Sequence, residues 1–159
     1  MKKLVIVLLA LALLVPVVAA QGVTAMVSPA RQVARVGEQF DVAVTLESGN
    51  VPVGSYTMEL LYDPQRIELV SVSGVPEGFV GIVNGTRPGR IRFNGANIDG
   101  AEGQTVLLTA TFEARRRGWA RLDLNVETMA EASTFTSLLP VQGCGGMVTI
   151  RPQFFWWRR

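Results

Sequence analysis

The stretch that decides the fold is Phe40-Asp41-Val42-Ala43-Val44-Thr45-Leu46. Large apolar side chains occupy every second position of this stretch, and smaller or polar ones lie between them. That period is typical of a β-strand with one buried and one wetter face. The same alternation recurs at residues 56–62, 108–114 and 122–126. We predict these segments to be the core strands.

Shorter apolar segments bounded by turn residues bring the predicted total to about nine strands. They lie at residues 23–27, 67–72, 80–83, 90–93 and 147–150. No segment has the pattern of a long amphipathic helix, so the helical crossovers that a parallel sheet needs are missing. We therefore predict an all-β fold, an antiparallel two-sheet β-sandwich. The run from Asn84 to Gly89 favours a tight reversal, which predicts a hairpin between its flanking strands.

Residues 1–20 have the pattern of a secretory signal peptide. Lys2 and Lys3 precede an apolar stretch that a proline interrupts and that ends in the small residues Val18-Ala19-Ala20. This stretch is short for a transmembrane helix. We expect residues 1–20 to be removed, which leaves one domain at residues 21–151 in a secreted, extracellular or cell-surface setting.

The charge of the expected mature chain gives no reason to predict a nucleic-acid partner. The 15 basic residues include two lysines, both in the predicted signal peptide, so 13 arginines remain against 13 acidic residues. A balanced chain lacks the basic excess that attracts phosphate backbones.

The residue types argue against catalysis. The chain has no histidine and one cysteine, Cys144, which removes imidazole-dependent triads and most zinc sites. The segment Asp99–Glu102 offers too few oxygen ligands for calcium, so we predict a plain turn and no metal or other cofactor. Acidic residues at outward strand positions are expected to be solvated, as at Glu59, Glu113, Asp123 and Glu127.

Three local features leave alternatives open. Cys144 cannot form an internal disulfide, and a small residue in a tight turn is favoured over a thiol that pairs between chains. Asn84-Gly85-Thr86 is an N-glycosylation acceptor pattern if the host glycosylates secreted chains. The aromatic and basic tail at residues 152–159 could contact a membrane interface or a partner, but packing back or fraying is favoured.

Several motifs together resemble a known family. Residues 36–44 read VGEQFDVAV, residues 58–64 read MELLYDP and lead into the strand at 67–72, and Gly89-Arg90-Ile91-Arg92-Phe93 precedes the strand at 107–114. These motifs resemble the cohesin domain and its wider relatives, the cohesin-like and carbohydrate-binding sandwiches of bacteria and archaea. The resemblance covers roughly Val23 to Arg151 and implies a nine-stranded jelly-roll sandwich.

The resemblance also implies a function. In cohesins of cellulose-degrading assemblies, one sheet face binds a calcium-loaded dockerin, so the expected partner is a protein in extracellular polysaccharide breakdown or at the cell surface. The sequence has no repeat, no dockerin-like calcium loop pair and no Pro/Thr linker, so we do not expect it to be a large scaffoldin itself. On the family's binding face, the expected partner-binding residues are Thr57, Glu59 and Leu61 on one strand, with Arg92 and Asn94 on another. Leu61 is either an apolar anchor or a singly exposed leucine.

Carbohydrate binding is the competing function, because sugars stack on exposed aromatic rings. The candidate rings are Trp119, which follows Gly118 in an expected turn, and Phe79, Trp156 and Trp157. Protein binding is favoured over sugar binding, and a structural role in the cell envelope ranks third.

Overall fold

The computed structural model describes residues 22–153, which contain strands and no helix. The strands are β1 (Thr24–Ser28), β2 (Arg31–Arg35), β3 (Gln39–Glu47), β4 (Val53–Tyr62), β5 (Ile67–Ser73), β6 (Val80–Asn84), β7 (Arg90–Ala101), β8 (Gln104–Ala114), β9 (Gly118–Glu131), β10 (Gln142–Cys144) and β11 (Gly146–Arg151). The predicted signal peptide and the candidate rings Trp156 and Trp157 lie outside the described residues. Within residues 22–153 no helix is long and apolar enough to cross a membrane.

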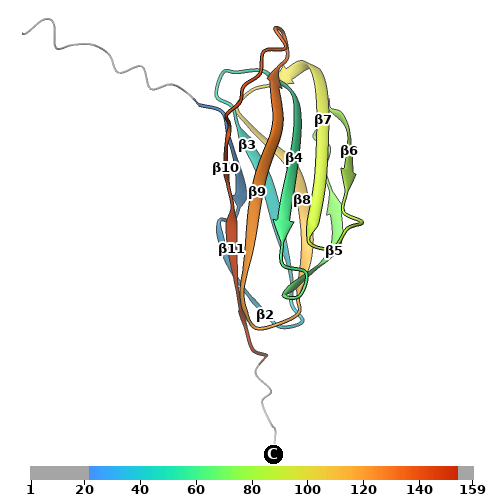
Figure 1. Cartoon of the computed structure of the whole chain (residues 1–159), viewed down its shortest axis with the longest axis vertical. Coiled ribbons are helices and arrows are strands. Elements are labelled where there is room, and N and C mark those ends of the chain that lie inside the picture. The colour runs from blue at the N-terminus through green and yellow to red at the C-terminus, as the bar shows by residue number, and fades with distance from the viewer. Residues whose placement is uncertain (1–21, 154–159) are drawn as a thin grey trace, which may run out of the picture.

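The strands form two sheets that pack face to face. The five-stranded sheet has the order β10-β1-β3-β8-β5, and the six-stranded sheet has the order β2-β11-β9-β4-β7-β6. Figure 1 shows an elongated sandwich whose strands follow its long axis, with the first and last described residues at opposite ends. The predicted all-β, jelly-roll sandwich is confirmed.

Aromatic side chains join the two sheets across the core. Phe112 of β8 stacks on Phe40 of β3 with ring centroids 5.9 Å apart, and meets the edge of Tyr62 from β4 at 5.0 Å. Farther along β4, Tyr56 packs against Phe79 at 5.5 Å and Phe93 at 6.1 Å. The inward positions of the alternating segments therefore make the core that the sequence pattern predicts.

The sheets are not entirely antiparallel as predicted, because two additional strands pair in parallel. The chain leaves the five-stranded sheet after β1 and enters the six-stranded sheet as β2, and it makes the same crossing from β10 to β11. As a result β1 pairs in parallel with β10, and β2 with β11. Cys144 ends β10 opposite Met26 and is exposed, so it lies in an extended strand and the predicted tight turn is wrong.

Two β-bulges change which side chains face the core. Between β3 and β8 the register shifts at Val44 and Thr45, and both Leu107 and Leu108 on β8 are fully buried. Between β4 and β9 the register shifts after Thr57, which leaves Glu127 of β9 without a directly opposite partner. An extra residue of this kind lets neighbouring side chains share one side of a strand.

The predicted hairpin before β7 is confirmed. Strands β6 and β7 are antiparallel, with Asn84 opposite Arg92. The Asn84 Oδ1 accepts hydrogen bonds from the Thr86 backbone N at 3.1 Å and from the Thr86 Oγ1 at 2.8 Å. This Asx-type turn begins the loop that connects the two strands.

Candidate binding face on the six-stranded sheet

The residues predicted to bind a partner lie together on the outer face of the six-stranded sheet. On β4, the core takes Tyr56, Met58, Leu60 and Tyr62, so the residues between them point away from the core. In the register of β4 and β7, Thr57 is opposite Asn94 and Glu59 is opposite Arg92. Leu61 is opposite Arg90, which is not among the predicted partner-binding residues.

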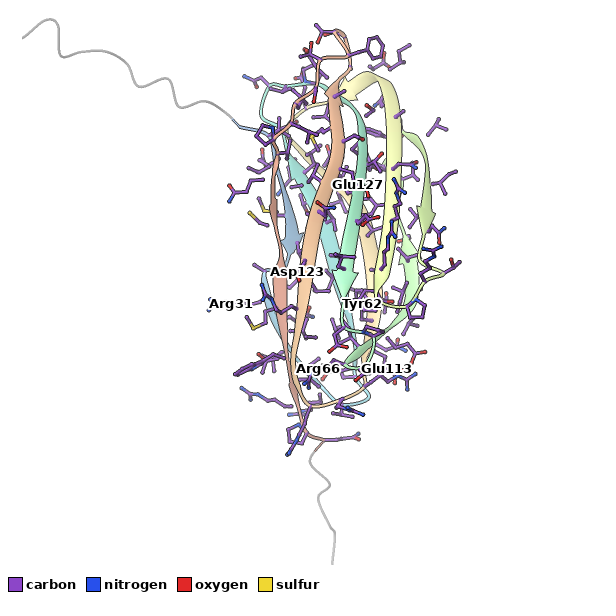
Figure 2. All side chains as sticks on the ribbon, in the orientation of Figure 1. Arg31, Tyr62, Arg66, Glu113, Asp123 and Glu127 are labelled. Atoms are coloured by element: carbon purple, nitrogen blue, oxygen red, sulfur yellow. The ribbon has the colours of Figure 1, made fainter. Side chains whose placement is uncertain are left out.

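Strand β9 continues this face on the other side of β4. Glu59 is opposite Asn125 and Leu61 is opposite Asp123. Figure 2 shows Asp123 and Glu127 spaced along the same sheet, with Asp123 nearer the end that carries Tyr62. The outer face therefore presents side chains from at least three adjacent strands, β7, β4 and β9.

Glu59 is the structural centre of the face, and it is not solvated as predicted. Only 8% of its surface is exposed. Its carboxylate pairs with the Arg90 guanidinium and lies 4.0 Å from the Arg92 Nε. Glu59 is covered because arginine side chains from the neighbouring strand are long enough to lie over its carboxylate and exclude water from it.

The ion pairs extend across three strands. The Arg92 Nη2 donates to the Glu127 Oε2 at 2.6 Å, which links β7 to β9 over the top of β4. The bulge on β9 presents Glu127 to this contact. These ion pairs restrain the Arg90 and Arg92 guanidinium groups over the outer side of β4.

Asn94 and Thr57 supply polar groups beside this network. The Asn94 Oδ1 accepts a hydrogen bond from the Ile82 backbone N at 3.1 Å, which ties β6 to the sheet. The amide NH2 of Asn94 is the group that this hydrogen bond leaves unused. Thr57, opposite Asn94, is half-buried.

Apolar side chains flank the polar centre on both sides. Leu61 is 38% exposed and lines a shallow hollow with Trp119, Arg121 and Asp123. On β6, Val80 is 83% exposed and Ile82 is 69% exposed. Sequence reasoning missed both β6 residues, because the apolar run from Phe79 to Val83 contains no polar residue that marks its outer side.

The rings proposed for sugar stacking separate into different environments. Phe79 is buried against Tyr56, so it cannot stack on a sugar, and that prediction is wrong. Trp119 lies on β9 and not in the expected turn, and it is 71% exposed. It borders a hollow of about 510 Å³ with Val33, Met147 and Arg31.

The described part of the chain offers no obvious metal centre. Within residues 22–153 no group of three or more His, Cys, Asp or Glu side chains is placed to hold a metal ion. The plain turn predicted at Asp99–Glu102 is wrong for most of that segment, because Asp99 to Ala101 belong to β7 and only Glu102 and Gly103 connect β7 to β8. The Asp99 backbone N donates to the Asn97 Oδ1 at 3.0 Å.

Comparison with known proteins identifies the architecture. A non-cellulosomal cohesin from the hyperthermophilic archaeon Archaeoglobus fulgidus is 19% identical, with a TM-score of 0.70 over 82% of this chain and 91% of that one. The chain has the cohesin fold. The cohesin CaCohA2 of Clostridium acetobutylicum is also 19% identical, with a TM-score of 0.63 over 80% of this chain and 90% of that one.

A cohesin of this fold is also known with its partner bound. The cohesin–dockerin complex of Clostridium thermocellum, described as a novel type I complex, matches with a TM-score of 0.67 and 13% identity, over 83% of this chain and 95% of that one. No family model matches the sequence, and no curated protein matches it. At identities of 13–19% these matches show the fold.

Proposed function

We propose that this chain is a secreted, non-catalytic module that binds a protein partner of the dockerin type on the outer face of its six-stranded sheet. The observation that carries the proposal is the grouping of Thr57, Glu59, Leu61, Arg92 and Asn94 on that face. The cohesin fold supports it, because one solved neighbour is a cohesin–dockerin complex.

The composition of the face suits a protein ligand. Protein interfaces combine apolar anchors with a polar rim and are enriched in arginine. Here Val80, Ile82 and Leu61 supply exposed apolar surface, while Asn94 and the held Arg92 supply directional donors. The hollows on this face are open, unlike the enclosed pockets that bury most of a small ligand.

Calcium enters this proposal through the partner. A dockerin-type partner would carry its own calcium, and this chain would meet the calcium-ordered surface. The signal-peptide pattern of residues 1–20 supports an encounter outside the cell, in polysaccharide breakdown or surface assembly. A chelator should then abolish binding by acting on the partner.

The first experiment is affinity capture from the host's own secreted proteins with the purified chain as bait, in calcium and in chelator. We expect a protein that is captured in calcium and released by the chelator. Capture of no protein, or of one that ignores calcium, would contradict dockerin-type assembly.

A pair of double variants then tests the face. We expect Leu61→Ser with Arg92→Gln to weaken partner binding by tenfold or more, because truncating central interface residues costs about 1–2 kcal/mol each. The matched control is Val70→Ser with Arg115→Gln. It also removes an exposed apolar side chain and an ion-paired arginine, but from the region of β5 and β8. Equal affinities of the two variants in calorimetric titrations would refute the assignment.

Sugar binding at Trp119 is the second candidate, favoured by its exposed ring beside Val33 and Met147. A titration with soluble polysaccharides should then change the tryptophan fluorescence of the wild type. The same titration should leave the fluorescence of the Trp119→Ala variant unchanged. No response across a broad polysaccharide panel would remove this candidate.

A further inference from the structure

A basic hollow lies at the β6–β7 end of the outer face. It measures about 300 Å³ and is lined by Asn84, Arg87, Arg90 and Arg92. The hairpin contributes Asn84 and Arg87, and β7 contributes the other two arginines. Three guanidinium groups therefore border one open space.

The side chains around this hollow present donors and no free acceptor. Guanidinium groups carry N–H donors and cannot accept a hydrogen bond. The Asn84 Oδ1 is already occupied by the Thr86 N and Oγ1, which leaves the amide NH2 of Asn84 available. A ligand that satisfies this hollow must bring acceptors.

Carboxylates behind the hollow hold two of the arginines without neutralising the whole site. Glu59 pairs with Arg90, and Glu127 pairs with Arg92. These contacts use only part of each five-donor guanidinium fork. Arg87 forms no ion pair with any carboxylate of residues 22–153, so three positive charges face two negative ones. The hollow keeps a net positive charge and spare donors.

We propose that this hollow binds a carboxylate, and that the carboxylate is an Asp or Glu side chain of the protein partner. The second part rests on the proposed function. An exposed apolar strip lies beside the hollow, since Val80 and Ile82 precede Asn84 on the outer side of β6. A partner segment with an acidic residue next to apolar residues matches both features, because the guanidinium fork takes a carboxylate with two parallel hydrogen bonds.

The test uses a fluorescein-labelled peptide of alternating Glu and Val, with its Gln-Val counterpart as the uncharged match. In anisotropy titrations with the purified protein, the Glu-Val peptide should bind saturably and the Gln-Val peptide at least tenfold more weakly. Equal binding of the two peptides would overturn the carboxylate site. Tighter binding of soluble polygalacturonate, which supplies carboxylates from a sugar, would overturn the assignment to a protein.

Two arginine variants locate the binding. Arg87→Gln should lower the affinity for the Glu-Val peptide roughly tenfold, because it removes a charge-assisted donor from the hollow. Arg116→Gln removes the same charge from an exposed position in the turn between β8 and β9, and should change the affinity less than about twofold. Equal losses in both variants would mean general charge attraction and would overturn the site.

The same variant separates this inference from the proposed function. If a captured calcium-dependent partner binds Arg87→Gln as tightly as the wild type, the carboxylate site is wrong and the proposed function stands. If no partner is captured but the Glu-Val peptide loses affinity in Arg87→Gln alone, the carboxylate site stands and the proposed protein partner is wrong.

Discussion

Tyr56 shows how the core beneath the face responds to pH. Its ring is buried between Phe79 and Phe93, and desolvation by burial raises the pKa of Tyr56 from 10.0 to about 12. The folded state holds this proton more tightly than the unfolded state does. The stabilisation is therefore complete below pH 10 and is lost as the pH rises from 10 to 12, by up to about 3 kcal/mol.

Urea unfolding between pH 8 and pH 12 measures this loss. Tyr56→Phe keeps the ring but has no proton to release, so its free energy of unfolding should fall less steeply over the same range. Parallel curves for the wild type and Tyr56→Phe would show that Tyr56 does not cause the alkaline loss.

Single residues also show what the sequence could and could not predict about the site. The strand period was sufficient to predict that Glu59 and Leu61 point away from the core. It could not predict that Glu59 is covered, because the covering groups belong to Arg90 and Arg92 on a strand that is distant in sequence. Whether an outward residue is exposed to solvent depends on its cross-strand neighbours, and these are set by the register of the strands.

The β6–β7 pair, which frames the basic hollow, requires glycine at position 81. A Cβ at Gly81 would lie 2.1 Å from the Asn94 backbone O, which is far inside contact distance. We expect Gly81→Ala to destabilise the protein by about 1–3 kcal/mol, because β6 must move away from β7. The control is Gly22→Ala, where a Cβ meets nothing within 4 Å.

Thermal unfolding followed by circular dichroism compares the two alanine variants. A melting temperature of Gly81→Ala equal to that of Gly22→Ala would show that β6 adapts without cost. A displaced β6 should also lower the affinity for the Glu-Val peptide, since Asn84 at the end of this strand lines the basic hollow.

Among the elements, the long strands with alternating apolar residues could be predicted from the sequence. The short strands and the β-bulges could not. Strands β3, β4 and β8 follow the apolar period closely. The short strands β2 and β10 carry few apolar residues, so their pairing comes from the position of β1 and β11 and not from local pattern. The bulge at Leu107 puts two consecutive leucines inside, which a strict period of two does not allow.

In the whole molecule, the residues that form the core are separate from those of the candidate binding face. The core is built from inward residues of both sheets, whereas the candidate face uses outward residues of the six-stranded sheet. Sequence patterning reports burial, so it predicted the sandwich well. A partner's identity depends on outward side chains, which the core leaves free to vary, and the same fold can therefore serve different ligands.

Phe112 tests how far the two sheets act as one unit. It lies on the five-stranded sheet, is fully buried, and meets Tyr62 at the end of β4 in the other sheet. We expect Phe112→Ala to lower the free energy of unfolding by about 3–5 kcal/mol, through lost burial and the cavity that remains. Phe135→Ala removes an exposed ring and should change it by less than about 0.5 kcal/mol. If urea unfolding of Phe112→Ala gave two transitions, with the six-stranded sheet keeping its stability, the sheets would be independent and the face would not depend on the shared core.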